Sequence, residues 1–266
     1  MALAEAHAVT RRGDGPTTVV MAHGLGGDQS HWSAVAEHLA RRHRVVTFDL
    51  AGSGRSDPAL FSPFRHASIV GFADDLAQLC AELELRDAVY VGHSMSGMAG
   101  ALAAAADPGL FSRMVLLGAS ACYVDDPSTG YVGGFTQAEI EQLLAAIASD
   151  FALWSAGFAS HVMAQPDRPD LGSEFARSLA RYEPDVALTV FRAAFLSDFR
   201  AEMGRVAPPT LVLNGVADPA VPAEAARWLA GAVTEGRLTE IDVEGHFPHV
   251  ADPASVIAPI DAFLAP

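Results

Sequence analysis

A serine stands in a turn of small residues between an apolar run and an alanine-rich stretch. The turn reads Gly92-His93-Ser94-Met95-Ser96; it follows the run 87–91, and residues 98–106 after it are rich in alanine. A buried strand that turns sharply into a helix at such a serine is a nucleophile elbow, in which a strained turn exposes the hydroxyl at the carboxyl edge of a sheet. The pattern therefore predicts that Ser94 is a catalytic nucleophile.

A serine hydroxyl is a weak nucleophile near neutral pH. It needs a base, and the base needs a carboxylate that holds its tautomer. In folds with an elbow the chain order is serine, acid, histidine. Asp218 follows the apolar run 210–215, and His246 follows the run 238–243. Both residues stand just past a predicted strand, as Ser94 does, so the sequence predicts Ser94, Asp218 and His246 as a catalytic triad.

Other residues could fill the same two roles. The alternative base is His249, and the alternative acids are Asp125, Asp126, Asp242 and Glu244. The first two of these acids follow the predicted strand 114–117, so the acid could come from an earlier loop. The last two fall within or beside a predicted strand. Cys122 is expected to be a small buried hydrophobic residue rather than a second nucleophile.

The oxyanion of an acyl-transfer reaction needs two backbone N–H donors. One belongs to the residue after the nucleophile, Met95, and the other to a loop after an early strand. The predicted strand 17–22 runs into His23-Gly24-Leu25-Gly26-Gly27, and we assign the second donor to the N–H of Leu25. A phosphate-binding loop is excluded because no Lys-Ser/Thr pair follows the glycines. His23 is expected to be structural.

Strands alternate with helices along most of the chain. We expect a hairpin over 6–21 around the turn 12–15, a helix over 31–42, a strand over 44–48 and a helix over 69–85, then the elbow elements and the strand 114–117. This alternation predicts an α/β fold with a doubly wound, mostly parallel sheet. Ligands bind such sheets outside the carboxyl ends of the strands, where the triad residues are expected.

The alternation breaks between Ala119 and Val206. Helical patterns cover 136–149, 150–163, 171–181 and 184–196, and Thr136 with Glu139 forms a capping box for the first. We interpret residues 121–204 as a helical lid inserted in a core made of residues 1–120 and 205–266. This segment holds eleven aromatic residues, and few of its charged residues are available to face a ligand. The lid is therefore expected to cover an apolar pocket over Ser94 that takes a neutral, mostly apolar substrate.

The composition agrees with a globular protein and excludes some partners. The chain has 266 residues, half of them hydrophobic, and a formal net charge of −15, which argues against nucleic acid or an anionic membrane as a partner. Cys80 and Cys122 are expected to be reduced and buried. Residues 1–10 lack the apolar core of a signal peptide, and no apolar stretch is long enough to span a bilayer, so we expect a soluble cytoplasmic protein. The scattered histidines predict no metal site, and no cofactor is expected.

The chain resembles the α/β-hydrolases, and more narrowly the subfamily that contains the bacterial stress-signalling hydrolase RsbQ and the karrikin and strigolactone receptors of plants. The resemblance covers essentially the whole chain. The bacterial branch fits better, chiefly through the segments at 122–123 and 165–169. The segments that carry the resemblance are 27–32, 91–98, 118–123, 133–137, 165–169, 195–198 and 245–249.

The resemblance implies the same triad and the same oxyanion donors, under a V-shaped lid of four helices. It also implies that Phe135, Trp154, Phe158 and Phe195 line the substrate pocket. The chain departs from the family at Leu25, where phenylalanine is common, so the pocket floor is expected to be roomier. Pro219, directly after Asp218, is a second departure that could shift the acid loop.

Two functions of different kinds follow. The first is a carboxylic-ester-type hydrolase that cleaves ester or lactone bonds through an acyl-enzyme. The second is an RsbQ-like signalling protein that binds, and slowly hydrolyses, a small hydrophobic ligand and passes the signal to a protein partner through its lid. An intact triad favours hydrolysis in either case, so the sequence favours the hydrolase.

Overall fold

The computed structural model describes residues 1–265. A β-sheet forms the centre of this part of the chain. Within these residues its seven strands are β1 (Thr10–Arg12), β2 (Thr18–Ala22), β3 (Arg44–Phe48), β4 (Ala88–His93), β5 (Phe111–Leu117), β6 (Thr210–Val216) and β7 (Gly236–Glu244). They lie in the order β1-β3-β2-β4-β5-β6-β7, with β2 to β7 parallel to their neighbours and β1 antiparallel to β3. The prediction of a mostly parallel, doubly wound sheet is confirmed.

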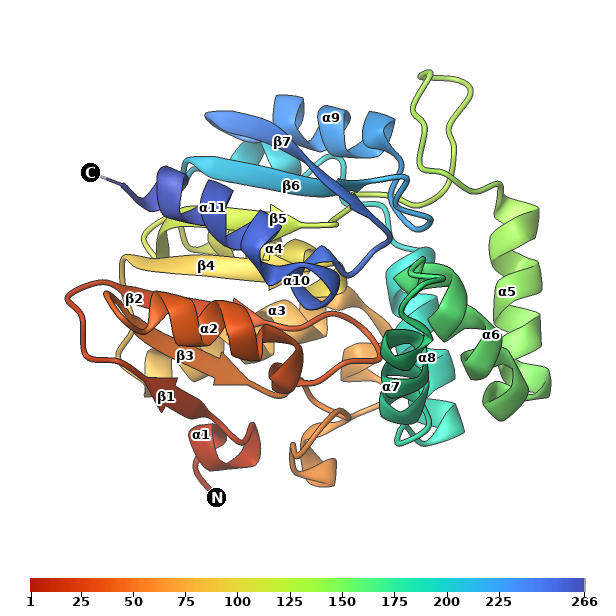
Figure 1. Cartoon of the computed structure of the whole chain (residues 1–266), viewed down its shortest axis with the longest axis horizontal. Helices are drawn as coiled ribbons and strands as arrows, with labels where there is room; N and C mark the ends of the chain where they lie inside the picture. Colours follow the sequence, from red (N-terminus) through yellow and green to blue (C-terminus); the bar gives the residue numbers. More distant parts are fainter. Residues whose placement is uncertain (266) are drawn as a thin grey trace.

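Helices cover both faces of the sheet (Figure 1). The elements are α2 (Ser33–Leu39) and α11 (Pro253–Leu264) on one face, and α3 (Ile69–Glu82), α4 (Met95–Ala106) and α9 (Ala223–Ala232) on the other. Along β2, Val19 and Met21 pack in the core under the first pair, whereas Val20 and Ala22 pack in the core under the second group. Because successive side chains of a strand point to opposite faces, a strand covered on both sides reads as a continuous apolar run.

The expected hairpin at the start of the chain does not form. The chain begins with α1 (Leu3–Ala6), and β1 then pairs with β3, Thr10 lying opposite Thr47, instead of turning back onto β2. Gly13 and Gly15 carry the chain across the end of β3 to reach β2. A Cβ atom on Gly13 would lie 2.2 Å from the carbonyl oxygen of His43, so this crossing requires glycine. The prediction of a turn at 12–15 agrees with the break between β1 and β2, but the prediction that the strand before this turn pairs with β2 was wrong.

Four helices lie between β5 and β6: α5 (Gln137–Ser149), α6 (Phe151–Met163), α7 (Pro169–Leu179) and α8 (Pro184–Phe195). The capping box predicted at Thr136 and Glu139 begins α5, and α7 and α8 each begin at a proline, whose fixed φ suits the first helical position. Figure 1 shows these helices side by side beyond the carboxyl ends of the strands, where the site is expected. The division into a core and a lid with the bounds given above stays a prediction.

The remaining described α-helix is α10 (Pro248–Ala251), which follows β7 after a short turn. Within residues 1–265 the longest helix, α3, has 14 residues, and none combines the length and the apolar character that a bilayer crossing requires.

Candidate functional site

The predicted strand–turn–helix is present around Ser94. β4 ends at His93, α4 begins at Met95, and Ser94 between them has φ 54° and ψ −122°, a conformation that costs energy for any residue with a Cβ. Gly92 lets the two backbones approach, because a Cβ there would lie 2.8 Å from the backbone nitrogen of Gly97. The turn presents the Ser94 hydroxyl at the carboxyl edge of the sheet.

A continuous line of hydrogen-bonding contacts joins the three predicted triad residues. The Oγ atom of Ser94 lies 2.9 Å from Nε2 of His246, and Nδ1 of His246 lies 2.8 Å from Oδ2 of Asp218. All three side chains are buried. Since an ionised carboxylate only accepts, Nδ1 carries the proton and Nε2 is left to accept from the serine hydroxyl.

The Asp218 carboxylate is itself held in place. Its Oδ1 atom accepts from the backbone N–H groups of Ala220 at 2.8 Å and Val221 at 3.1 Å. These two bonds form although Pro219 has no N–H, so the proline does not displace the acid from His246. On the other side, Gly118 (φ 55°) leaves room for the imidazole, because a Cβ there would lie 3.1 Å from Cε1 of His246.

The glycine loop after β2 lies directly against the elbow. A Cβ on Gly24 would lie 2.4 Å from Nδ1 of His93 and 3.2 Å from Cβ of Ser94, so glycine permits this approach. Within residues 1–265 we find no hydrogen bond donated by the N–H of Leu25 or of Met95. Both donors therefore remain available beside the serine.

A small apolar cavity lies over the hydroxyl. Its volume is about 30 Å³. Its walls are Leu25, Ser94, Met95, Tyr123, Phe158, Phe175, Phe191, Ala194, Phe195, Ala220, His246 and Phe247. Leu25 is part of this wall, and five phenylalanines contribute to it, so the cavity is apolar; that its floor is roomier than with a phenylalanine at position 25 stays a prediction.

Comparison with known proteins shows the family of this chain. Residues 17–253 match the family described as alpha/beta hydrolase fold. The chain belongs to the alpha/beta-hydrolase family. A solved structure of a hydrolase from Oleispira antarctica superposes on it with a TM-score of 0.95 at 28% identity, covering 98% of this chain and 95% of that one.

Its relatives at higher identity include plant receptors and esterases. The Karrikin insensitive 2 receptor CA of Petunia hybrida is 37% identical, over 95% of this chain and 93% of that protein. The Strigolactone esterase RMS3 of Pisum sativum is 34% identical, over 98% and 97%. The predicted resemblance to the karrikin and strigolactone receptors is thus confirmed, and the prediction of an ester-type hydrolase agrees with these names.

The residues considered as alternatives for the base and the acid of this hydrolase make contacts away from Ser94 and His246. His249 packs against Trp32 with 4.3 Å between the ring centroids, and within residues 1–265 neither of its ring nitrogens has a hydrogen-bond partner. Burial holds its pKa well below the ordinary value, so it is neutral, but no contact with Ser94 is found. Asp125 accepts from the N–H groups of Gly133 and Gly134. The Asp126 carboxylate forms an ion pair with the guanidinium of Arg200 at 3.0 Å.

The other candidates are also engaged or solvated. Asp242 and Glu244 are exposed on β7. The Cys122 thiol is buried and donates to the carbonyl of Val124 at 3.4 Å, and burial raises its pKa, which keeps it protonated and unreactive. The structure therefore brings Asp218, rather than any other carboxylate considered, to His246.

Of the four predicted pocket residues of the hydrolase, Phe158 and Phe195 reach the cavity. Trp154 lies one turn earlier on α6 and stacks behind Phe158 at 4.5 Å, and Phe135 packs against Phe195 at 5.9 Å. The aromatic pattern identified the cluster, but it could not tell the side chains at the cavity from those one layer behind.

Sequence reasoning did not assign Tyr123 to the cavity. This side chain is fully buried near Ser94 and Asp218, and burial raises its pKa to about 12. The hydroxyl therefore stays protonated, and it can donate to a ligand oxygen. The available signal was its place in the segment 118–123 directly after β5, one of the segments that carry the family resemblance.

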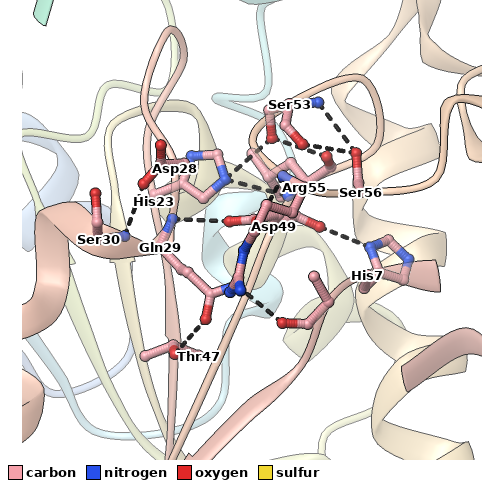
Figure 2. A network of polar contacts seen from close by, with 12 residues as sticks. His7, His23, Asp28, Gln29, Ser30, Thr47, Asp49, Ser53, Arg55 and Ser56 are labelled. Atoms are coloured by element: carbon pink, nitrogen blue, oxygen red, sulfur yellow. Dashed lines mark hydrogen bonds and ion pairs between the residues drawn. The ribbon is translucent and has the colours of Figure 1, made fainter. Parts of the chain in front are cut away.

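A polar network that the sequence did not predict surrounds His23, at the start of the glycine loop after β2 (Figure 2). Its centre is Asp49, a buried carboxylate after β3 that accepts from the N–H groups of Gln29 at 2.9 Å and Arg55 at 2.8 Å. The Oε1 atom of Gln29 in turn accepts from the Thr47 hydroxyl at 2.9 Å. These bonds fix the two loops that flank His23.

His23 links this network to the site of the hydrolase. Its Nε2 accepts from the N–H of Leu50 at 3.1 Å, so the proton is on Nδ1, which donates to the carbonyl of Gly24 at 2.8 Å. That carbonyl belongs to the same peptide unit as the N–H of Leu25, and the two point in opposite directions. The backbone carbonyl of His23 also accepts from the Ser96 hydroxyl at 2.5 Å, which ties the loop to the elbow helix.

Proposed function

We propose that this hydrolase cleaves ester or lactone bonds of a small, mostly apolar substrate through Ser94, His246 and Asp218. The observation that carries the proposal is the continuous contact from the serine Oγ through the imidazole to the buried carboxylate, at 2.9 Å and 2.8 Å. Relatives named esterases support the bond type, and the apolar walls of the cavity support the substrate class.

The steps follow from the positions of the donors and acceptors. His246 accepts the hydroxyl proton as Oγ of Ser94 bonds to the carbonyl carbon, and the oxyanion accepts from the N–H groups of Leu25 and Met95. Collapse breaks the bond to the alkoxide, which takes the proton from the imidazolium and leaves an acyl-serine. A water molecule, deprotonated by His246, then attacks the acyl carbon; the bond to Oγ of Ser94 breaks, Oγ takes the proton back from His246, and the acid is released. With a lactone, the alkoxide stays attached to the acyl group.

The cellular setting is part of this proposal. Both Cys80 and Cys122 are unpaired and buried, which suits a reducing compartment such as the cytoplasm. The net charge of −15 disfavours nucleic acid and anionic membranes as partners.

A second function shares the same pocket. In it the cavity binds a small hydrophobic ligand, turnover is slow, and a protein partner recognises the conformation of α5–α8. One observation favours it: a relative at 37% identity is named a receptor, the Karrikin insensitive 2 receptor CA.

A time course of p-nitrophenyl acetate and butyrate hydrolysis separates the two functions. Wild type and Ser94→Ala are followed from the first turnover. Sustained turnover that Ser94→Ala lacks supports the hydrolase. A burst of about one product per protein followed by very slow release supports the ligand-sensing function, and equal rates for both proteins would refute the hydrolase.

A further inference from the structure

The backbone of His246 is held from two sides by different parts of the fold. Its N–H donates to the carbonyl of Val162 at 2.8 Å, and its own carbonyl accepts from Nε2 of His93 at 2.8 Å. His93 is the last residue of β4, directly before Ser94, whereas Val162 lies in the last turn of α6. The histidine is thus fixed between the sheet and one of the four inserted helices.

Two further contacts join the end of α6, residues 162–165, to residues 244–246. The side-chain Nε2 of Gln165 donates to the carbonyl of Glu244 at 2.9 Å. Gly245, with φ 95°, packs so closely that a Cβ there would lie 2.3 Å from the carbonyl oxygen of Met163. Three successive residues of the histidine loop therefore contact the end of one helix.

The end of a helix is suited to this task. The last four carbonyls of an α-helix have no partner within the helix and must bond elsewhere. Here the chain leaves α6 through Ala164 in the left-handed conformation (φ 48°), and the Val162 carbonyl is satisfied by His246. The loop after β7 gains an anchor that the sheet does not provide, because β7 ends at Glu244.

The precision required explains why an anchor matters. The imidazole must meet the Ser94 hydroxyl and the Asp218 carboxylate at the same time, and a 1 Å misplacement of a reacting group costs on the order of 100-fold in rate. The same helix carries Phe158, one turn before Val162, into the cavity wall. One element therefore touches both the substrate space and the backbone of the base.

We propose that the end of α6 positions His246, through the carbonyl of Val162 and the side chain of Gln165. The inserted helices then take part in catalysis by holding the base as well as by covering the cavity. Val162 and Gln165 are positioning residues, since they act through His246 and line no part of the cavity. The proposal rests on the proposed function, in which His246 is the base.

Gln165→Ala tests the proposal with little disturbance of the backbone. Gln165→Lys keeps a donor for the Glu244 carbonyl, and Asp167→Ala changes an exposed residue of the same segment and serves as the matched control. For p-nitrophenyl acetate we expect Gln165→Ala to lower kcat about tenfold at unchanged KM, since a partial displacement costs less than a full 1 Å. We expect Gln165→Lys to recover most of the loss, and Asp167→Ala to match wild type.

Amide hydrogen exchange of His246 gives a readout that does not depend on turnover. If the end of α6 holds this N–H, exchange at His246 becomes faster in Gln165→Ala, while amides of β4 and β6 keep their wild-type rates. In the same samples, the proton NMR signal of the imidazole Nδ1–H bonded to Asp218 should broaden. Unchanged His246 exchange together with wild-type kcat in Gln165→Ala would overturn the proposal.

Gly245→Ala is the stronger variant, because its Cβ cannot coexist with the Met163 carbonyl at the present separation. We expect a larger loss of kcat than in Gln165→Ala, with a cooperative thermal transition retained. If this variant does not fold, the comparison of Gln165→Ala with Gln165→Lys still tests the proposal. Failure of the proposed function is distinguishable. It appears as wild-type turnover equal to that of Ser94→Ala, and the His246 exchange rates then still report on positioning.

Discussion

Nε2 of His93 donates to the backbone carbonyl of His246 at 2.8 Å, so the residue before the nucleophile holds the residue proposed to activate it. The two rings lie 4.8 Å apart between centroids. Burial holds the pKa of His93 well below its ordinary value, which keeps this ring neutral. A charged ring at that distance would oppose the imidazolium that forms during acyl transfer, so burial of His93 favours the proposed chemistry.

The acid can be identified by two matched substitutions. Asp218→Asn removes the charge that stabilises the imidazolium and allows the wrong tautomer, and we expect kcat to fall by on the order of 10³–10⁴. Asp125→Asn should keep wild-type activity, since an amide oxygen can still accept from Gly133 and Gly134. Steady-state hydrolysis of p-nitrophenyl butyrate measures both. The reverse ranking would move the acid to the loop after β5.

His23 should matter although it does not reach the cavity. His23→Phe removes one of the two donors to the Gly24 carbonyl, leaving the Gly27 N–H at 3.2 Å, and so loosens the peptide unit that carries the Leu25 N–H. Deleting an oxyanion donor outright costs about 10²–10³ in kcat, and we expect a misaligned one to cost roughly tenfold. Affinity for a boronic acid, which mimics the tetrahedral intermediate, should fall in parallel at unchanged KM. His161→Phe, at an exposed position on α6, is the control; equal behaviour of both variants would contradict this role.

The two stacked rings of α6, Trp154 and Phe158, predict different phenotypes. Phe158→Ala opens the cavity wall, so we expect the preference among p-nitrophenyl esters to shift toward longer acyl chains. Trp154→Ala removes the stacked partner behind it and should lower the free energy of unfolding by roughly 1–3 kcal/mol with the chain-length preference unchanged. A chain-length series and urea unfolding of both variants test this. A shifted preference in Trp154→Ala would place that ring at the substrate instead.

Stability should fall as the pH is lowered below about 6.5. Burial lowers the pKa of His31 to about 4 and holds those of His93 and His249 well below their ordinary value, so all three are neutral in the folded chain. Below pH 6.5 the unfolded chain binds protons that the folded chain does not, and the linkage favours unfolding by up to about 1.4 kcal/mol per pH unit for each histidine. Stability from this source is present above pH 6.5 and is lost toward pH 4.

Urea unfolding between pH 8 and pH 4.5 measures this linkage. His249→Phe keeps an aromatic ring beside Trp32 and removes one of the titrating groups, so the decline should become shallower. Because His249 is not the proposed base, this variant should also retain Ser94-dependent hydrolysis. A pH profile identical to that of wild type would exclude His249 as a contributor.

The sequence predicted the parts of the site that depend on local pattern. Ser94, Asp218 and His246 each follow an apolar run, and in a parallel sheet the ends of such runs meet at one edge. Their meeting could therefore be predicted from order alone. The identity of the acid among several carboxylates needed the loop geometry that brings Asp218, and not Asp125, to the imidazole.

Features that depend on long-range packing were not predictable. The pairing of β1 with β3 instead of β2 is decided by the crossing at Gly13, and a glycine turn looks the same in either topology. Likewise Trp154 and Phe158 lie four residues apart on one helical face, so pattern alone cannot tell which ring reaches the cavity. The contact from Val162 to His246 joins segments 84 residues apart in sequence (246 − 162), and no local signal marks it.

The chain leaves the sheet after β5 and returns before β6 at nearly the same place. Cys122 and Asp198 form an antiparallel bridge, and the N–H of Phe199 donates to the carbonyl of Ala121 at 2.8 Å. The entropy of closing a loop grows only with the logarithm of its length, so exchanging everything between these two points would add little to the cost of folding. The segment between these two points, which contributes much of the cavity wall, can therefore change in evolution as one unit. The condition is that the end of one of its helices still holds the backbone of His246.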